Sequence, residues 1–206
     1  MTHSDTSRLR RAAKNPRNAI AYAIGRLRGE WCRWFLPLTG HRFTAGRGLQ
    51  VRGRLLIRGP GLVRFGDNVQ VWGDVTPWTY RADSVIDIGT NSRMGGTRFG
   101  CTASITIGRD CLLADCRLTD SDFHSIQANR HDESAPIRVA PIVVEDNVWI
   151  AAQSGVLPGT TIGRNSVVSF GAVCSGRFPA DVIIIGNPAR VAGKVPSGEV
   201  VPAPQP

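Results

Sequence analysis

The stretch DSDFHSIQANRHDESAP, residues 120–136, holds the histidines best placed to do chemistry. His124 and His131 lie in it, and the chain has four histidines in all. Imidazole titrates near neutral pH and can take a proton from a hydroxyl group, so histidine is the most frequent general base in enzymes. Asp122, Asp120 or a backbone carbonyl could hold the second ring nitrogen. The stretch predicts a proton-transfer site with His124 as the base and with Asp122 supporting it.

The sequence on both sides of this stretch repeats with a period of six. Apolar residues recur at that spacing in three blocks, namely Val51, Ile57, Val63, Val69 and Val75, then Ile88, Met94, Ile107 and Leu113, and finally Val144, Ile150, Val156, Ile162, Val168 and Cys174. Small residues follow four positions later in the last block, at Ser154, Thr160, Ser166 and Ala172. A period of six fits neither an α-helix nor simple strand alternation. It predicts a β-solenoid in which each hexapeptide forms one short strand and one corner.

The repeat is interrupted between Leu118 and Val144. A solenoid accommodates an insertion as a loop that projects from one corner, and such loops commonly carry the binding face. We therefore expect residues 119–143 to form a catalytic and acceptor-binding loop. Asp120 and Arg130 are its candidate acceptor contacts, although Arg130 could instead pair with a neighbouring carboxylate.

Trp149 stands where the regular repeat resumes after the loop. A bulky side chain at this position breaks the pattern of small corner residues. Two interpretations are open: Trp149 is a packing anchor at the rim of a coil, or it lines the catalytic site.

The positive charge of the chain is concentrated near the N-terminus. Residues 1–54 hold 12 basic and two acidic side chains, whereas the formal net charge of the whole chain is +9. Within residues 7–36, apolar groups recur in steps of three and four with arginines opposite, which predicts an amphipathic helix. This helix either packs on the solenoid as a cap or lies on a membrane surface. No nucleic-acid-binding motif is present, so nucleic acid is not an expected partner.

The predicted organisation has three parts: a basic helical segment at 1–40, the solenoid at 41–190 and a tail at 191–206. No apolar run is long enough to span a bilayer. The five cysteines show no metal-ligand spacing and are expected to be reduced, buried thiols. We therefore expect a cytoplasmic protein without a metal, possessing at most a peripheral contact with the inner face of the membrane.

A resemblance to a known family covers most of residues 45–195 and is most specific over 120–195. It rests on the SDFHSI stretch and on the block from PIVVEDNVWI to GNPARVAGKV, residues 141–195. The chain resembles the hexapeptide-repeat acyltransferases, and most closely those that O-acetylate sugars and capsular polysaccharides. The resemblance implies an all-β fold, a left-handed parallel β-helix, preceded here by the N-terminal amphipathic α-helix. It also implies a homotrimer with active sites between neighbouring subunits.

The same resemblance implies an acetyl-CoA-dependent O-acetyltransferase that acts on a hydroxyl of a sugar or surface polysaccharide. Direct attack in a ternary complex is expected, with His124 as the base and Trp149 lining the site. The residues implied to bind the donor are Trp149, Ala152, Phe170 and Ser175 along the acyl arm, and Arg190 and Lys194 at its phosphates. Two departures concern the donor: Phe170 stands where a small residue is usual, and Gly176 where a lysine is usual, for which Arg177 could substitute.

The sequence leaves three other functions to consider. N-acetylation of a sugar nucleotide or small amine would use the same fold and donor. A non-catalytic β-helix scaffold would need neither the DSDFH stretch nor Trp149. A carbonic anhydrase of this fold would need three histidine ligands, and His124 and His131 are the sole plausible candidates.

Overall fold

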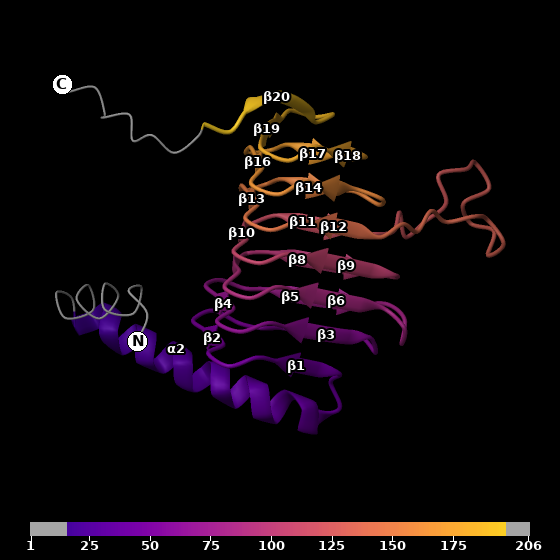
Figure 1. The fold of residues 1–206 in the computed structure, drawn as a ribbon. Helices are drawn as coiled ribbons and strands as arrows, with labels where there is room; N and C mark the ends of the chain where they lie inside the picture. Colours follow the sequence, from indigo (N-terminus) through magenta and orange to yellow (C-terminus); the bar gives the residue numbers. More distant parts are fainter. Residues whose placement is uncertain (1–15, 197–206) are drawn as a thin grey trace.

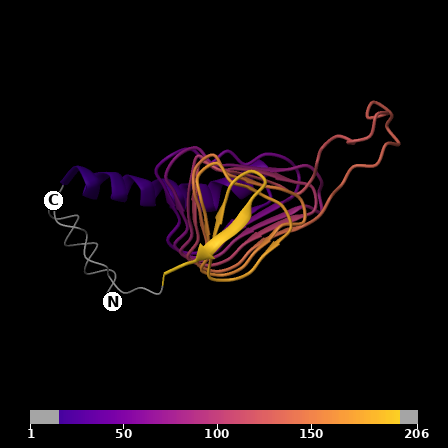
Figure 2. The ribbon, with the colours of Figure 1, turned by 90° about the horizontal axis from the view of Figure 1, so that it is seen from above.

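Three β-sheets form the faces of a triangular solenoid in the computed structural model, which describes residues 16–196 (Figures 1 and 2). Sheet 1 consists of β1 (Phe43–Ala45), β3 (Leu62–Phe65), β6 (Val85–Ile88), β9 (Ser104–Ile107), β12 (Ile142–Val144), β15 (Thr161–Ile162) and β18 (Arg177–Phe178). Sheet 2 consists of β2 (Gln50–Val51), β4 (Gln70–Val71), β7 (Arg93–Gly95), β10 (Leu112–Ala114), β13 (Trp149–Ile150), β16 (Val167–Val168), β19 (Val182–Ile185) and β20 (Arg190–Lys194). Sheet 3 consists of β5 (Thr76–Thr79), β8 (Arg98–Cys101), β11 (Arg117–Thr119), β14 (Gly155–Val156) and β17 (Val173–Cys174).

The core is the interior of this solenoid. From β1 to β19, equivalent strands of successive coils pair in parallel, so apolar side chains stack in columns along the axis. In sheet 1, for example, Ile86 lies in register with Ile105, which lies in register with Ile142. All the apolar residues of the predicted six-residue period are buried. The predicted parallel β-solenoid of hexapeptide repeats is therefore confirmed.

Polar corners hold successive coils together. Asn147 and Asn165 adopt positive φ angles of 57° and 60° at equivalent corners. The Asn147 amide donates to the Asn165 side chain at 3.0 Å, and the Asn165 amide donates to Asp181 at 2.7 Å. Asparagine and aspartate tolerate this left-handed conformation better than other non-glycine residues. The small corner residues contribute too, because the Ser154 hydroxyl donates to the Ser169 carbonyl of the next coil at 3.0 Å.

Helix α2 (Pro16–Phe35), followed by the 3-10 helix η1 (Leu36–Thr39), covers the first coil (Figure 1). The helix packs on β2 through small residues, Gly25, Gly29 and Cys32, which are buried. A Cβ atom at Gly29 would lie 1.9 Å from the Leu49 carbonyl oxygen, so only glycine permits this approach. The predicted helix is present and caps the solenoid, and the part predicted before residue 16 lies outside the described residues.

The apolar stripe of α2 faces away from the solenoid. The exposed large apolar side chains of α2 are Ile20, Tyr22, Ile24, Leu27, Trp31, Trp34 and Phe35. The helix therefore uses its small-residue face to pack and leaves its apolar face uncovered within one chain. None of the helices in residues 16–196 has the length and apolar character of a membrane span.

The C-terminal segment departs from the predicted boundary at residue 190. After a turn at Gly186, where φ is 90°, the chain reverses and β20 pairs antiparallel with β19. Residues 191–194 therefore extend sheet 2 at the last coil instead of starting a separate tail. The rest of the predicted tail, 197–206, lies outside the described residues.

All five cysteines are free and buried. Burial raises the pKa of the Cys111 and Cys174 thiols to about 11 and that of Cys116 to about 12. A thiol with so high a pKa is almost entirely protonated near neutral pH and is a poor nucleophile. These cysteines therefore serve as small apolar core residues.

Candidate active site

The interrupted repeat forms a loop that projects from the edge between sheets 3 and 1, between β11 and β12 (Figures 1 and 2). Its base is a short antiparallel stem. The Asp122 backbone N–H donates to the Arg138 carbonyl at 3.1 Å, and the Ala140 N–H donates to the Asp120 carbonyl at 2.9 Å. The Arg138 guanidinium also donates to the Pro158 carbonyl at 2.8 Å. The stem therefore anchors the loop to the next coil.

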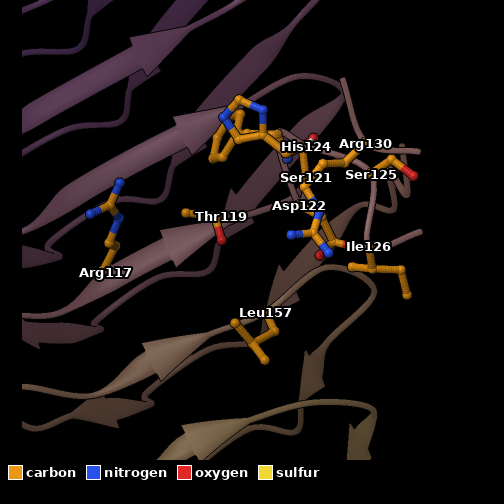
Figure 3. A pocket seen from close by; sticks show the side chains of 10 residues that line it. Arg117, Thr119, Ser121, Asp122, His124, Ser125, Ile126, Arg130 and Leu157 are labelled. Carbon is orange, nitrogen blue, oxygen red and sulfur yellow. Dashed lines mark hydrogen bonds between the residues drawn. The ribbon is translucent and has the colours of Figure 1, made fainter. Parts of the chain in front are cut away.

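His124 lies just beyond this stem, at the rim of an open cavity of about 690 Å³ (Figure 3). The cavity is bounded by the outer face of sheet 3 and by the loop. Its lining includes Arg117 and Thr119 of β11, Leu157 of the following coil, and Arg130 of the loop. The His124 side chain is exposed, so a substrate hydroxyl can reach the imidazole.

The aromatic neighbour of His124 is fixed by packing. Phe123 has a φ of 60°, and its ring contacts that of Tyr80, with centroids 4.7 Å apart. Tyr80 in turn stacks on Trp78, with centroids 5.3 Å apart and planes within 7°. A Cβ atom at Gly100 would lie 2.8 Å from the Phe123 ring, so the absence of a side chain there makes room for it. This stack holds the backbone next to His124, and sequence reasoning missed it because its members lie on different coils.

Asp120 does not face the cavity. It is fully buried, and its carboxylate accepts hydrogen bonds from the Thr102 N–H at 2.6 Å and the Ala103 N–H at 2.7 Å. A carboxylate so occupied stabilises a corner of the preceding coil and cannot meet an acceptor. The expectation that Asp120 contacts the acceptor is therefore wrong.

Asp122 and Arg130 both line the cavity. Within residues 16–196, no hydrogen bond joins the Asp122 carboxylate to the His124 imidazole. Over the same part of the chain, Arg130 forms no ion pair with Asp132, which instead accepts hydrogen bonds from Ser134. Arg130 donates to the Gln127 carbonyl at 3.4 Å. Its guanidinium is thus not neutralised by a carboxylate among the described residues.

Trp149 lies on a different face of the solenoid. It belongs to β13 of sheet 2, where it is in register with Leu112 and Val167, and it is 47% exposed. Sheet 2 is opposite the edge from which the loop projects (Figure 2). The structure therefore does not bring Trp149 and His124 of one chain together.

The predicted donor-binding residues fall into two groups. Ala152 and Phe170 lie on successive coils at the edge between sheets 2 and 3. The two coils are joined there by a hydrogen bond from the Gly171 N–H to the Ala152 carbonyl at 3.1 Å. Arg190 pairs with Ile185 at the same end of sheet 2. Ser175 follows β17 at the other end of sheet 3, and Lys194 lies at the far end of β20. Three of the six predicted positions, Ala152, Phe170 and Arg190, thus share one edge.

Across residues 16–196, no group of three or more histidine, cysteine, aspartate or glutamate side chains is arranged to hold a metal ion.

Comparisons with known proteins match this architecture. Residues 141–176 match the family model described as bacterial transferase hexapeptide (six repeats). A relative from Escherichia coli K12, named putative lipopolysaccharide biosynthesis O-acetyl transferase WbbJ, is 29% identical over 163 residues, which are 75% of this chain and 70% of that protein. Alignments with other curated relatives span between 28% and 56% of those proteins' own lengths.

Two solved structures are similar in fold. The polySia specific acetyltransferase NeuO superposes with a TM-score of 0.61 at 24% identity, over 76% of this chain and 68% of that chain. A hexapeptide-repeat acetyltransferase from Vibrio cholerae O1 biovar eltor, complexed with acetyl coenzyme A, superposes with a TM-score of 0.57 at 21% identity, over 90% of this chain and 92% of that chain. At these identities the two structures establish the fold alone.

In residues 141–176 the chain is similar to the hexapeptide-repeat transferases, and its curated relatives are named as acetyltransferases. The fold agrees with that similarity.

Proposed function

We propose that the protein transfers an acetyl group from acetyl-CoA to a hydroxyl group of a sugar or surface polysaccharide. The observation that carries this proposal is the exposed His124 imidazole at the rim of an open cavity, at the one long break in the hexapeptide repeat. The family supplies the acetyl-transfer chemistry, and the histidine supplies the base that a hydroxyl nucleophile needs.

In the proposed mechanism, His124 accepts the proton of the acceptor hydroxyl as its oxygen bonds to the thioester carbonyl carbon. Collapse of the resulting oxyanion breaks the carbon–sulfur bond, and His124 returns the proton to the departing thiolate. Backbone N–H groups of the coils are suitable donors to the oxyanion. A thiolate is a good leaving group, so direct attack in a ternary complex suffices without a covalent enzyme intermediate. Asp122 lines the same cavity and is the proposed carboxylate that orients the imidazole.

A homotrimer would complete this site. Trp149 and Leu112 leave apolar surface exposed on sheet 2, and Ile126 of the loop is 83% exposed. Large apolar side chains exposed on separate surfaces are typical of a subunit interface. We infer that the loop of one subunit reaches sheet 2 of its neighbour, which would place Trp149 of that neighbour beside His124.

The donor is proposed to lie along the edge that carries Ala152, Phe170 and Arg190. The Ala152 and Phe170 backbones follow one another on stacked coils, which suits an extended acyl arm, and Arg190 offers a guanidinium to a phosphate. Ser175 and Lys194 lie at other edges, so their proposed contacts require a donor bound between two subunits.

Helix α2 is proposed to make a peripheral contact with an anionic membrane. Its outward face carries Trp31, Trp34 and Leu27, which are more than half exposed. Arg28 of the same helix does not belong to this outward face, because its guanidinium donates to the Arg52 and Gly53 carbonyls of the first coil. Amphipathic helices with aromatic residues and arginines bind such surfaces in the plane of the interface.

The function is tested by measuring thiol release from acetyl-CoA with a panel of neutral and acidic glycans, sugar nucleotides and amino sugars. We expect release with a glycan and a product whose acetyl group is removed by mild alkali, as an ester is. An alkali-stable amide would instead identify an N-acetyltransferase, and no release with any acceptor would favour a scaffold.

Replacing Gly100 by valine is expected to lower kcat by about ten- to a hundredfold, because the new side chain would displace Phe123 and thereby His124. Steady-state kinetics at saturating donor would measure it. Gly95→Ala is the control, on strand β7 of sheet 2, which precedes β8 in the same coil, since a Cβ there would meet its nearest atom at 3.6 Å, an ordinary contact. Equal activity of the two variants would contradict the role given to the aromatic stack.

A further inference from the structure

The outer face of sheet 3 carries arginines that are stacked on one another. Arg98 of β8 is in register with Arg117 of β11, and both side chains are exposed. Two coils before Arg98, Arg58 pairs in register with Trp78, and its guanidinium lies 5.4 Å from the centre of that ring. Like charges opposite each other on neighbouring strands repel. A pair such as Arg98 and Arg117 is therefore costly unless an anion lies between the two guanidinium groups.

Three arginines on other parts of the solenoid are neutralised from a neighbouring coil, whereas others, such as Arg58 and Arg93, form no ion pair within residues 16–196. Arg54 pairs with Asp74, Arg64 pairs with Asp87 at 2.9 Å, and Arg109 pairs with Asp146 at 2.8 Å. Within residues 16–196, neither Arg98 nor Arg117 forms an ion pair. The outward positions of the described strands of sheet 3 carry no carboxylate; they are Thr76, Trp78, Arg98, Gly100, Arg117, Thr119, Gly155 and Val173.

This arginine pair adjoins the proposed catalytic base. Arg117 lines the cavity at whose rim His124 lies (Figure 3). Arg98 is the neighbour of Arg117 on the preceding coil. Trp78 and Tyr80 continue the same surface toward the N-terminal coils and are 41% and 43% exposed. A sugar whose hydroxyl reaches His124 would thus have neighbouring sugar units beside cationic and aromatic side chains.

We propose that Arg98 and Arg117 form a subsite for an anionic group of the acceptor, a carboxylate or phosphate on a sugar unit next to the one that is acetylated. The proposal rests on the proposed acetyl transfer to a glycan. Arginine presents a planar fork of donors that matches both kinds of oxyanion. The proposal therefore restricts the expected class of acceptors from glycans in general to acidic glycans.

Two other sources of an anion are possible in principle, the phosphates of the donor and a carboxylate of a second subunit. Arg98 and Arg117 begin β8 and β11 at the edge between sheets 2 and 3, and Ala152, Phe170 and Arg190 lie on later coils of that edge, with Ala152 on the coil directly after Arg117. The acceptor is the favoured source because Arg117 lines the cavity that His124 also lines. The experiment distinguishes all three sources.

The test compares acidic oligosaccharides with matched neutral ones. One pair of probes is oligogalacturonate and its carboxyl-reduced form, and the other is a phosphodiester-linked oligosaccharide and its dephosphorylated sugar. The variants are Arg98→Gln, Arg117→Gln and the double variant. Arg64→Gln is the control, since it removes an exposed arginine that Asp87 already neutralises. We expect an acidic probe to be preferred by wild type, and the ratio of kcat/KM for acidic over neutral probe to fall about tenfold in each single variant.

Direct binding is measured in parallel by tryptophan fluorescence titration, which does not depend on turnover. We expect about tenfold tighter binding of an acidic probe at low salt, a difference that both variants reduce and Arg64→Gln preserves. The inference is overturned if neutral and acidic probes bind equally to wild type. It is also overturned if the variants raise the KM for acetyl-CoA instead, or if they change the sedimentation coefficient. Equal transfer to neutral and acidic probes would overturn the anion subsite but leave the proposed acetyltransferase function standing. Binding of acidic probes without any thiol release would support the subsite but contradict the proposed function.

Discussion

Replacement of His124 by alanine is expected to lower kcat for acetyl transfer by about 10²- to 10⁴-fold, the range by which a positioned general base accelerates proton transfer. The side chain is exposed and forms no hydrogen bond with any of residues 16–196, so the variant should retain the wild-type melting temperature. Steady-state kinetics with an acceptor found in the panel would measure the loss. Donor affinity, measured by calorimetry, should change little because the imidazole acts on the acceptor hydroxyl.

His131→Ala is the matched control for this prediction. His131 belongs to the same loop and is also exposed, but it does not line the cavity. We expect nearly full activity from this variant. Full activity of the His124→Ala protein would remove the proposed mechanism, and a comparable loss in both variants would point to the loop as a whole instead of to one base.

Co-assembly of two inactive variants is expected to restore activity if the site is shared between subunits. Trp149 and His124 lie at separate faces of one chain, so a site that uses both must take them from different chains. His124→Ala and Trp149→Ala proteins should each be strongly impaired when assembled alone. In trimers mixed at random in equal amounts, about one quarter of the sites would pair an intact loop with an intact Trp149.

The measurement uses co-expression of the two variants with different affinity tags and sequential purification on both. Activity well above that of either parent would support the shared site, and the untagged parents mixed after folding provide the background. Activity no higher than that background would contradict it, as would a monomer in sedimentation. In that case Trp149 would be a packing anchor, the alternative interpretation of its position.

Much of the fold was predictable because it repeats. A six-residue apolar period over Val144, Ile150 and Val156 leaves few architectures that bury every such side chain, and all three are buried. The loop was predictable for the same reason, since an interruption in a repeat can leave the solenoid only at a corner. Small residues such as Ser154 marked the corners, where the structure shows hydroxyl-to-backbone hydrogen bonds.

The contents of the site were only partly predictable. The sequence pointed to His124 by its residue type and its place in the gap. The structure places this histidine at a cavity, and its role as the base stays a prediction. Sequence reasoning misplaced Asp120, because two backbone N–H groups of the preceding coil capture that carboxylate and remove it from the surface. Polarity and proximity to a histidine could not show this, because the partners, Thr102 and Ala103, are distant along the chain.

The sequence by itself therefore determined the repeat, the core, the loop and the candidate base. Only the tertiary structure decided which residues meet across coils, such as Phe123 with Tyr80 and Arg98 with Arg117. It also decided that Trp149 lies on a different face from His124. The physical reason is the hydrogen-bond register between coils. Every corner that adds or omits a residue shifts that register, so a residue's neighbours above and below depend on the whole path of the chain and not on its local pattern.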